Sequence, residues 1–227
     1  MQLSDNTLSV LKNFSTINPN LVFRQGNKVK TISVAKNILA TATISETIPQ
    51  EFGIYDLNEF LSVVGLFDNP DLSFTESSVK IKDGGSSVNY FFSALENLTT
   101  PSKDITMPNC EIEFTLTESD LAKLRKAAAT LGVSEVSVCG EAGGSDVTIK
   151  VSDTKNATSN TFELNINSGD VVRPDNAFSM VFNIGNFKFA SGDYRAKLSS
   201  KLISNFKNTN TDIEYWVALE KSSVFNA

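Results

Sequence analysis

Apolar residues recur at helical spacing in two places, near the N-terminus and near the middle of the chain. The first predicted helix covers 5–18 and carries Leu8 and Leu11 on one side. The second begins after Thr117 and runs to about 131. Both segments start with a hydroxyl residue and an acidic first turn, followed by Leu-x-x-Leu. Their similarity indicates an internal duplication; because Leu-x-x-Leu is common, coincidence is the alternative.

A second pair of similar segments supports the duplication. Ile54–Phe60 resembles Val181–Phe187, and the two pairs follow the same order along the chain. In both members a strand-like start leads into a short predicted helix, over 57–66 in the first half and near 184–189 in the second. Each half is therefore expected to hold a long helix, several strands and a short helix.

Between the predicted helices, short segments alternate apolar and polar residues as strands do. In the first half these segments are 21–24, 29–34, 38–45, 72–75, 79–82 and 88–92. In the second half they are 111–116, 135–139, 147–151, 161–166, 178–182, 194–198, 202–206 and 213–219, with a loop at 167–176. Hairpin turns are predicted at Gly26-Asn27 and at Asp83-Gly84-Gly85. The expected fold class is α+β, with two similar β-rich domains that each carry two short helices.

Residues 95–109 interrupt this pattern. The segment is polar and contains Pro101 and Pro108. It is predicted to connect a first domain at 1–94 to a second domain at 110–227. Residues 1–109 hold 8 basic and 11 acidic side chains, and 110–227 hold 12 and 15, so each part carries a net charge of −3. Equal charges favour two equivalent units over one basic and one acidic domain.

The composition removes much of the usual chemistry of enzymes. Among the 227 residues there is no histidine, the commonest general base and zinc ligand. Cys110 and Cys139 are too few for a disulfide framework and are expected to be small buried thiols in a reducing compartment. The chain shows neither a signal peptide nor a membrane-spanning apolar run, so a cytoplasmic protein without membrane contact is expected. The net charge of −6 disfavours wrapping of nucleic acid by the whole surface, but it permits a local basic face.

Two features that resemble catalytic motifs have simpler explanations. Gly140–Asp146 is rich in glycine, but it lacks the terminal Lys-Ser/Thr and the following helix of a phosphate-binding loop, so a hairpin turn is predicted. Glu118 and Asp120 stand in the first turn of a helix, where the helix dipole favours carboxylates. No catalytic residue, metal site or cofactor is expected, and the chain is predicted not to be an enzyme.

The polar side of the second long helix is basic, although the chain is acidic. Lys123 and Lys126 project opposite the leucines of this helix, with Arg125 near the boundary. Lys12 lies at the edge of the polar side of the first helix, and Lys188 belongs to the short helix of the second half. Solubility and the helix dipole are one explanation for these cations. Their recurrence on several helices favours the other explanation, a surface that faces phosphates.

Four strings match a known family: Leu11–Asn18, Ile54–Leu61, Gly192–Tyr194 and Tyr215–Glu220. They resemble segments of the sliding clamps of T-even-type bacteriophages. The match runs in order over nearly the whole chain and is loosest over 135–177. None of the strings is a catalytic motif, so the specificity of the resemblance comes from their combination and spacing.

The resemblance implies a DNA polymerase processivity factor. In that family, protomers of two similar domains form a head-to-tail homotrimeric ring around duplex DNA, with helices lining the hole and sheets forming the outer wall. An ATP-dependent clamp loader places the ring, the C-terminal tail of the DNA polymerase docks on it, and such clamps also help to activate late transcription. Lys12 lies inside a matched string and is expected to face DNA. Lys123, Arg125, Lys126 and Lys188 are assigned to the same face from their helix positions.

A partner peptide is expected to dock in an apolar groove beside the connector. The candidate docking residues are Leu98, Ile105, Met107, Val224 and Phe225. Ordinary packing of a linker and a tail is the alternative explanation for these residues. For the whole chain, the alternative function is that of a β-rich phage structural or assembly protein without sliding activity. An enzyme of unrecognised type is the third hypothesis.

Overall fold

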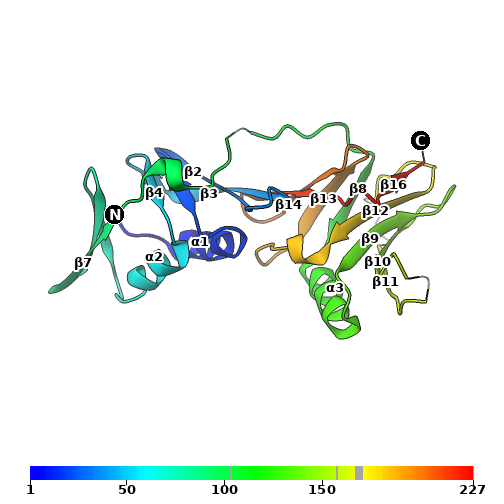
Figure 1. The fold of residues 1–227 in the computed structure, drawn as a ribbon, viewed down its shortest axis with the longest axis horizontal. Coiled ribbons are helices and arrows are strands. Elements are labelled where there is room, and N and C mark those ends of the chain that lie inside the picture. The colour runs from blue at the N-terminus through cyan, green and yellow to red at the C-terminus, as the bar shows by residue number, and fades with distance from the viewer. Residues whose placement is uncertain (103, 157, 167–170, 227) are drawn as a thin grey trace. The chain divides into compact units, whose positions relative to one another are not determined.

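The computed structural model describes residues 1–102, 104–156, 158–166 and 171–226. The chain forms two compact units, Met1–Asp104 and Ile105–Ala227. Figure 1 shows the first unit in blue to green and the second in green to red. The predicted connector begins with a single 3-10 turn, η1 (Leu95–Asn97), and its other described residues form neither helix nor strand. Domain limits at 94 and 110 stay a prediction.

The first unit packs two helices against short antiparallel strands. Its helices are α1 (Asp5–Ile17) and α2 (Leu57–Val64). Its strands are β1 (Leu21–Phe23), β2 (Gly26–Ile32), β3 (Ile38–Ile48), β4 (Phe52–Ile54), β5 (Asp71–Phe74), β6 (Ser78–Asp83) and β7 (Ser86–Phe91). Strand β1 pairs with β4, β2 pairs with β3, and β5, β6 and β7 form one sheet in that order. Helix α1 contacts both β3 and α2, so its apolar side forms part of the core of this unit.

The predicted hairpin turn at Gly26-Asn27 is wrong. Strand β1 pairs with β4, and Gly26 and Asn27 are the first residues of β2, where the register with β3 shifts. Gly26 has a φ of +112°, so the glycine serves an irregular strand start and not a two-residue turn. The turn at Asp83-Gly84-Gly85 is confirmed, because it joins the paired strands β6 and β7.

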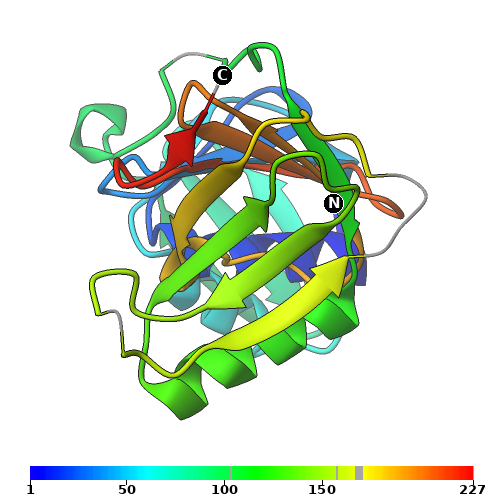
Figure 2. The same cartoon turned by 90° about the vertical axis from the view of Figure 1, so that its right-hand side faces the viewer.

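The second unit contains one long helix, α3 (Glu118–Leu131), and two antiparallel sheets. Its strands are β8 (Ile112–Leu116), β9 (Glu135–Gly140), β10 (Val147–Val151), β11 (Phe162–Ile166), β12 (Phe178–Asn183), β13 (Tyr194–Ser199), β14 (Ile203–Asn208), β15 (Ile213–Ala218) and β16 (Val224–Phe225). One sheet has the order β11-β10-β9-β12-β16. In the other, β8, β13, β14 and β15 are successive neighbours. Figure 2 turns this unit toward the viewer and shows α3 running beside the first sheet.

The short helix expected near 184–189 is limited to one 3-10 turn, η2 (Ile184–Asn186). Phe187 and Phe189 are both buried, with their rings stacked at a centroid distance of 5.2 Å. Residues two apart in an α-helix point to different sides, so burying both rings in one core requires the chain to leave the helix. Part of the loop predicted at 167–176 lies outside the described residues.

The two units repeat one plan. Helix α1 corresponds to α3, the pairs β1–β4 and β2–β3 correspond to β9–β12 and β10–β11, and β5-β6-β7 corresponds to β13-β14-β15. The helix caps correspond as well. Ser4 and Thr117 each accept an N–H three residues on, while Asp56 and Asn183 each accept one two residues on. The repeated sequence segments therefore mark equivalent places in two similar domains.

Candidate nucleic-acid interface

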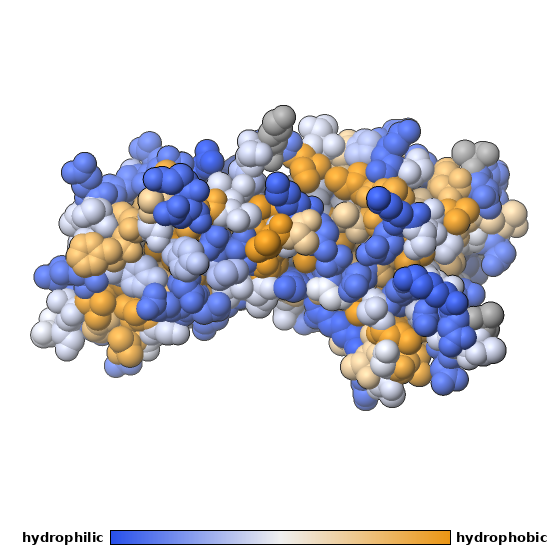
Figure 3. Space-filling view, viewed as in Figure 1, coloured by the Kyte–Doolittle hydropathy of each residue, from blue (hydrophilic) through white to orange (hydrophobic). Residues whose placement is uncertain are grey.

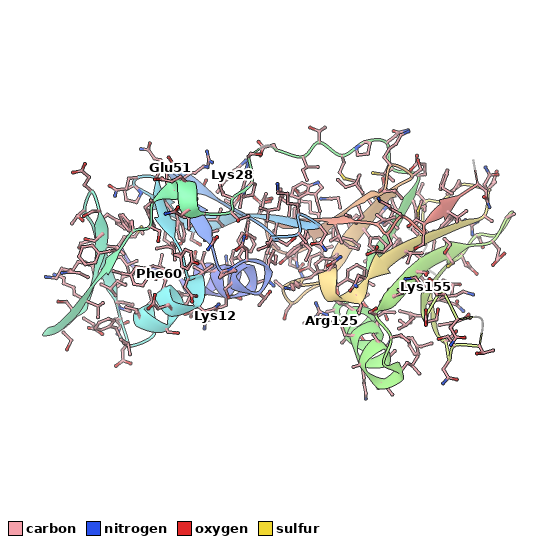
Figure 4. The ribbon with its side chains drawn as sticks, in the orientation of Figure 1. Lys12, Lys28, Glu51, Phe60, Arg125 and Lys155 are labelled. Carbon is pink, nitrogen blue, oxygen red and sulfur yellow. The ribbon has the colours of Figure 1, made fainter. Side chains whose placement is uncertain are left out.

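Helix α1 presents Lys12 on its exposed side. The neighbouring Leu11 and, one turn on, Phe14 are fully buried, which fixes the rotation of the helix. Lys12 lines a hollow of about 220 Å³ together with Asp5 and Asp68, among other residues of the first unit. Figure 4 labels Lys12 on this helix. The cation is therefore accessible, as the sequence predicts, with acidic groups nearby.

The start of α1 is fastened by a carboxylate from strand β3. The Ser4 N–H donates to Glu46 Oε1 at 2.6 Å, and the Thr7 hydroxyl donates to Glu46 Oε2. Partial burial opposes ionisation of Glu46, but these hydrogen bonds outweigh it and hold the pKa of Glu46 below its ordinary value. An ionised carboxylate also suits the positive end of a helix. No signal in the sequence marks this anchor, because Glu46 occupies an ordinary polar position in an alternating strand.

The start of α3 is fastened from a loop instead. The Glu118 N–H donates to Asp193 Oδ1 at 2.8 Å, next to the N-cap Thr117. The preceding Gly192 has a φ of +125°, and a side chain there would place its Cβ 2.6 Å from Asn208 Nδ2. The positive φ favours glycine, and Gly192 thereby allows Asp193 to reach the helix. Part of the matched string Gly192–Tyr194 is thus explained as a helix anchor.

Lys123 and Lys126 line the exposed side of α3. Lys123 is exposed but forms an ion pair with Asp120 at 3.2 Å. Both lysines border an apolar groove of about 390 Å³ whose other lining residues are Ala127, Thr130, Leu131, Thr161 and Phe162. Figure 3 shows apolar surface gathered over this helix. The face that the sequence assigned to phosphates therefore combines cations with an apolar strip that ends at strand β11.

Arg125 is exposed like these lysines, but its guanidinium also bonds the protein backbone. Its Nη2 donates to the carbonyl oxygen of Phe187 and, at 3.4 Å, to that of Phe189. Partial burial of the guanidinium lowers the pKa of Arg125. Lys188, which lies between the two phenylalanines, is half-buried. Figure 4 shows Arg125 between α3 and the segment that follows β12.

The candidate docking residues do not form one group. Leu98 is buried in the first unit, where the absence of a side chain at Gly53 leaves room for it. Ile105 and Met107 are half-buried. Val224 and Phe225 form β16, the end strand that pairs with Ser179 and Phe178 of β12. These placements fit ordinary packing for Leu98 and leave Val224, at 51% exposure, the most accessible of the set.

The glycine-rich segment and the two cysteines occupy ordinary structural positions. The segment after Gly140 joins the paired strands β9 and β10, so the predicted hairpin is confirmed. Cys110 and Cys139 are free and half-buried, and burial raises the pKa of both thiols. Within the described ranges, no group of three or more Cys, Asp or Glu side chains is placed to hold a metal ion. In the same part of the chain, none of the helices has the length and apolarity needed to span a membrane.

Comparison with known proteins decides the family. A model of the DNA polymerase processivity factor matches residues 4–100, and a model of the C-terminal part of the gp45 sliding clamp matches 113–221. The sliding clamp of Vibrio phage KVP40 is 34% identical over 97% of this chain and 99% of its own length. The chain belongs to the sliding-clamp family. The sliding clamp of Enterobacteria phage T4 is 28% identical over 98% of each chain.

Solved structures agree on the fold of this clamp. A PCNA from Thermococcus kodakaraensis aligns with a TM-score of 0.72 at 12% identity, covering 97% of this chain and 99% of its own. A Helicobacter pylori beta clamp aligns with a TM-score of 0.68 at 12% identity, covering 94% of this chain and 63% of its own. The predicted family, the two-domain α+β fold and the function of a DNA sliding clamp are therefore confirmed. The alternative function, a β-rich phage structural or assembly protein without sliding activity, is not supported.

Several residues of the matched strings shape the fold. Asn18 donates to the Ile32 and Thr99 carbonyl oxygens, which fixes the end of α1. Asp56 caps α2. The Tyr215 hydroxyl accepts the Ala190 N–H at 3.0 Å from inside the core. These residues of the matched strings position helices or pack in the core, whereas Lys12, which also belongs to a matched string, is exposed.

Proposed function

We propose that three copies of this clamp close head to tail into a ring around duplex DNA and hold the replicative polymerase on its template. The proposal rests on one observation above all. The same helix occurs in both units, buried on one side and carrying exposed lysine on the other: Lys12 on α1, and Lys123 and Lys126 on α3. Together with Lys188 and Arg125, these residues form the proposed DNA-facing surface.

Such a surface suits sliding. Phosphate contacts are independent of sequence and carry no base readout, so a ring can move along the duplex while it stays linked to it. Each chain has a net charge of −6, so the lysines form basic strips on an acidic protein that repels DNA elsewhere. The chemistry is that of binding, and we infer that the clamp has no enzymatic activity of its own.

The contact between copies is assigned to two free strand edges. Among the described residues, strands β7 and β11 each end their sheets, and an unpaired edge can accept a strand from another chain. Phe91, at the end of β7, is 70% exposed. The apolar groove between α3 and Phe162 lies directly beside β11 and offers apolar surface for a second copy to cover. Pairing β7 of one copy with β11 of the next is heterologous, so it builds a ring when the rotation closes.

Partners follow from the same proposal. An ATP-dependent clamp loader opens the ring on DNA, and the C-terminal tail of the polymerase occupies an apolar site near Ile105, Met107 or the β16 strand, Val224–Phe225. Because the similar clamps come from phages, the proposed compartment is the cytoplasm of the infected bacterium.

Charge reversal tests the DNA-facing surface. The triple variant Lys12→Glu, Lys123→Glu, Lys126→Glu is expected to lose most of its loading and its stimulation of the polymerase, while sedimentation still gives three times the 24.7-kDa chain mass. The matched control reverses three other exposed lysines, Lys155, Lys201 and Lys221. Full activity of the first variant, or equal loss in both, would refute the assignment.

A further inference from the structure

We propose that Arg125 is a positioning residue that fastens the 187–189 segment, and with it Lys188, to helix α3. The inference rests on the proposed function, because it concerns how the basic surface of the second unit is held. Its basis is geometric. One guanidinium nitrogen donates to the carbonyl oxygens of both Phe187 and Phe189, on the two sides of Lys188. A side chain that links a helix to the backbone on both sides of one residue restricts where that residue can go.

The same segment is held from the core side. Phe187 and Phe189 are buried, and the Phe189 ring contacts the rings of Tyr194 and Tyr215. The Tyr194 hydroxyl donates to the Ala190 carbonyl oxygen at 2.7 Å, while the Tyr215 hydroxyl accepts the Ala190 N–H. The aromatic cluster therefore fixes the segment to the sheet, and Arg125 links this segment to α3.

The chemistry favours arginine for this task. The Nη2 group of the planar guanidinium carries two N–H donors in fixed directions, whereas a lysine ammonium is a compact point charge that keeps its water. Lys123 and Lys126 lie beside Arg125 on the same helix. Both are exposed, and neither bonds these carbonyl oxygens. All three cations of α3 are exposed, and Arg125 differs because its guanidinium also bonds the backbone of the 187–189 segment.

Substitution separates the positioning role from a direct phosphate contact. We compare Arg125→Lys and Arg125→Gln with Lys126→Arg and Lys126→Gln, using native-state amide hydrogen exchange without DNA. Both Arg125 variants are expected to speed exchange of the amides at 188–190 by about tenfold, because a hydrogen bond of typical strength is lost. Neither Lys126 variant should do so. If Arg125→Lys protects these amides as the wild type does, the proposal is overturned.

The salt dependence of binding to a short linear duplex gives the second readout. The slope of log K against log salt is negative, and loss of one phosphate contact makes it less steep by about 0.9. Lys126→Gln is expected to make the slope less steep, and Lys126→Arg is expected to keep the wild-type slope. For Arg125, the lysine variant should fail to rescue whatever binding the glutamine variant loses. Rescue by lysine would make Arg125 a phosphate contact. If Lys126→Gln leaves the slope unchanged while the exchange result holds, the DNA-facing proposal fails and the role of Arg125 stands.

A measurement on the unmodified clamp keeps the test valid if the Arg125 variants fail to fold. In the nitrogen-15 NMR spectrum, a guanidinium held by two carbonyl oxygens shows hindered rotation and slow exchange of its Nη protons. Arg195, which pairs with Glu113 at 3.4 Å, serves as an internal reference on a neighbouring part of the unit. A freely rotating Arg125 side chain would contradict the proposal.

Discussion

Helices α1 and α3 are the same element of a duplicated domain, yet they are held in place by different chemistry. Both begin at a hydroxyl N-cap, Ser4 or Thr117, and both bury a leucine completely, Leu11 or Leu124. The start of α1 is then fastened by a glutamate from a strand. The start of α3 is fastened by Asp193, which lies in the loop just before strand β13.

The comparison shows which features of the helix both units share and which features are particular to one unit. The caps and the buried leucines recur because any copy of the fold needs a helix that starts at that place and packs with that side inward. The anchoring carboxylates do not recur, since either direction of approach can satisfy the same helix start. The charged outer side differs most, with one lysine on α1 and two lysines plus the engaged Arg125 on α3.

The buried leucines should show the largest effects, and equal ones. Leu11→Ala and Leu124→Ala each remove a fully buried side chain, so each is expected to lower the free energy of unfolding by about 2–5 kcal/mol. Native-state hydrogen exchange of the core amides reports the two units separately. A cost confined to one of the two variants would show that the helices are not equivalent in the core.

The anchors should show smaller and unequal effects. Glu46→Ala leaves both the Ser4 N–H and the Thr7 hydroxyl without their partner and is expected to cost about 1–3 kcal/mol. Asp193→Ala removes one bond to the Glu118 N–H and is expected to cost about 1 kcal/mol. Each loss should appear as faster exchange of the amides in the first turn of its own helix. Equal losses in both helices after either substitution would contradict local anchoring.

The Glu46 anchor also predicts an effect of acid on helix α1. The pKa of Glu46 lies below its ordinary value of 4.5 in the folded clamp, so its stabilising contribution is present above that value. The contribution is lost as the pH falls through the lowered folded pKa. The first turn of α1 should therefore loosen below about pH 4.5 in the wild type, by an amount that Glu46→Gln abolishes. Hydrogen exchange of the amides in the first turn of α1, measured from about pH 3 to about pH 6, checks this prediction. Equal acid sensitivity in Glu46→Gln would assign the effect to other groups.

The outer lysines should show the smallest effects, one phosphate contact at a time. Lys12→Gln and Lys126→Gln are each expected to lower the salt slope for a short duplex by about 0.9, with no change in unfolding free energy. Anisotropy titrations at several salt concentrations measure the slope. If only one variant lowers it, the two helices do not face DNA in the same way.

The sequence predicted most of the fold, and the reasons for its failures are specific. Helix periodicity and hydroxyl caps located α1 and α3, and alternation located most strands. Gly26-Asn27 misled because a glycine with positive φ serves an irregular strand start as well as a turn. The short helix near 184–189 was overestimated because two phenylalanines in one core, Phe187 and Phe189, pull the chain out of the helix.

The site was only partly predictable. Exposed lysines on a helix follow from periodicity, so Lys12, Lys123 and Lys126 were accessible to sequence reasoning. Glu46 and the engagement of Arg125 were not, because each depends on a partner more than thirty residues away in the chain. No local pattern records such a contact.

The central claim is that this clamp holds DNA by encircling it. The direct measurement loads the clamp on a nicked circular duplex and follows its retention in high salt before and after the circle is cut. A ring that slides is expected to stay on the circle and to leave from the new ends once the DNA is linear. Equal retention on circular and cut DNA would mean that the protein grips the duplex directly, and it would contradict the account.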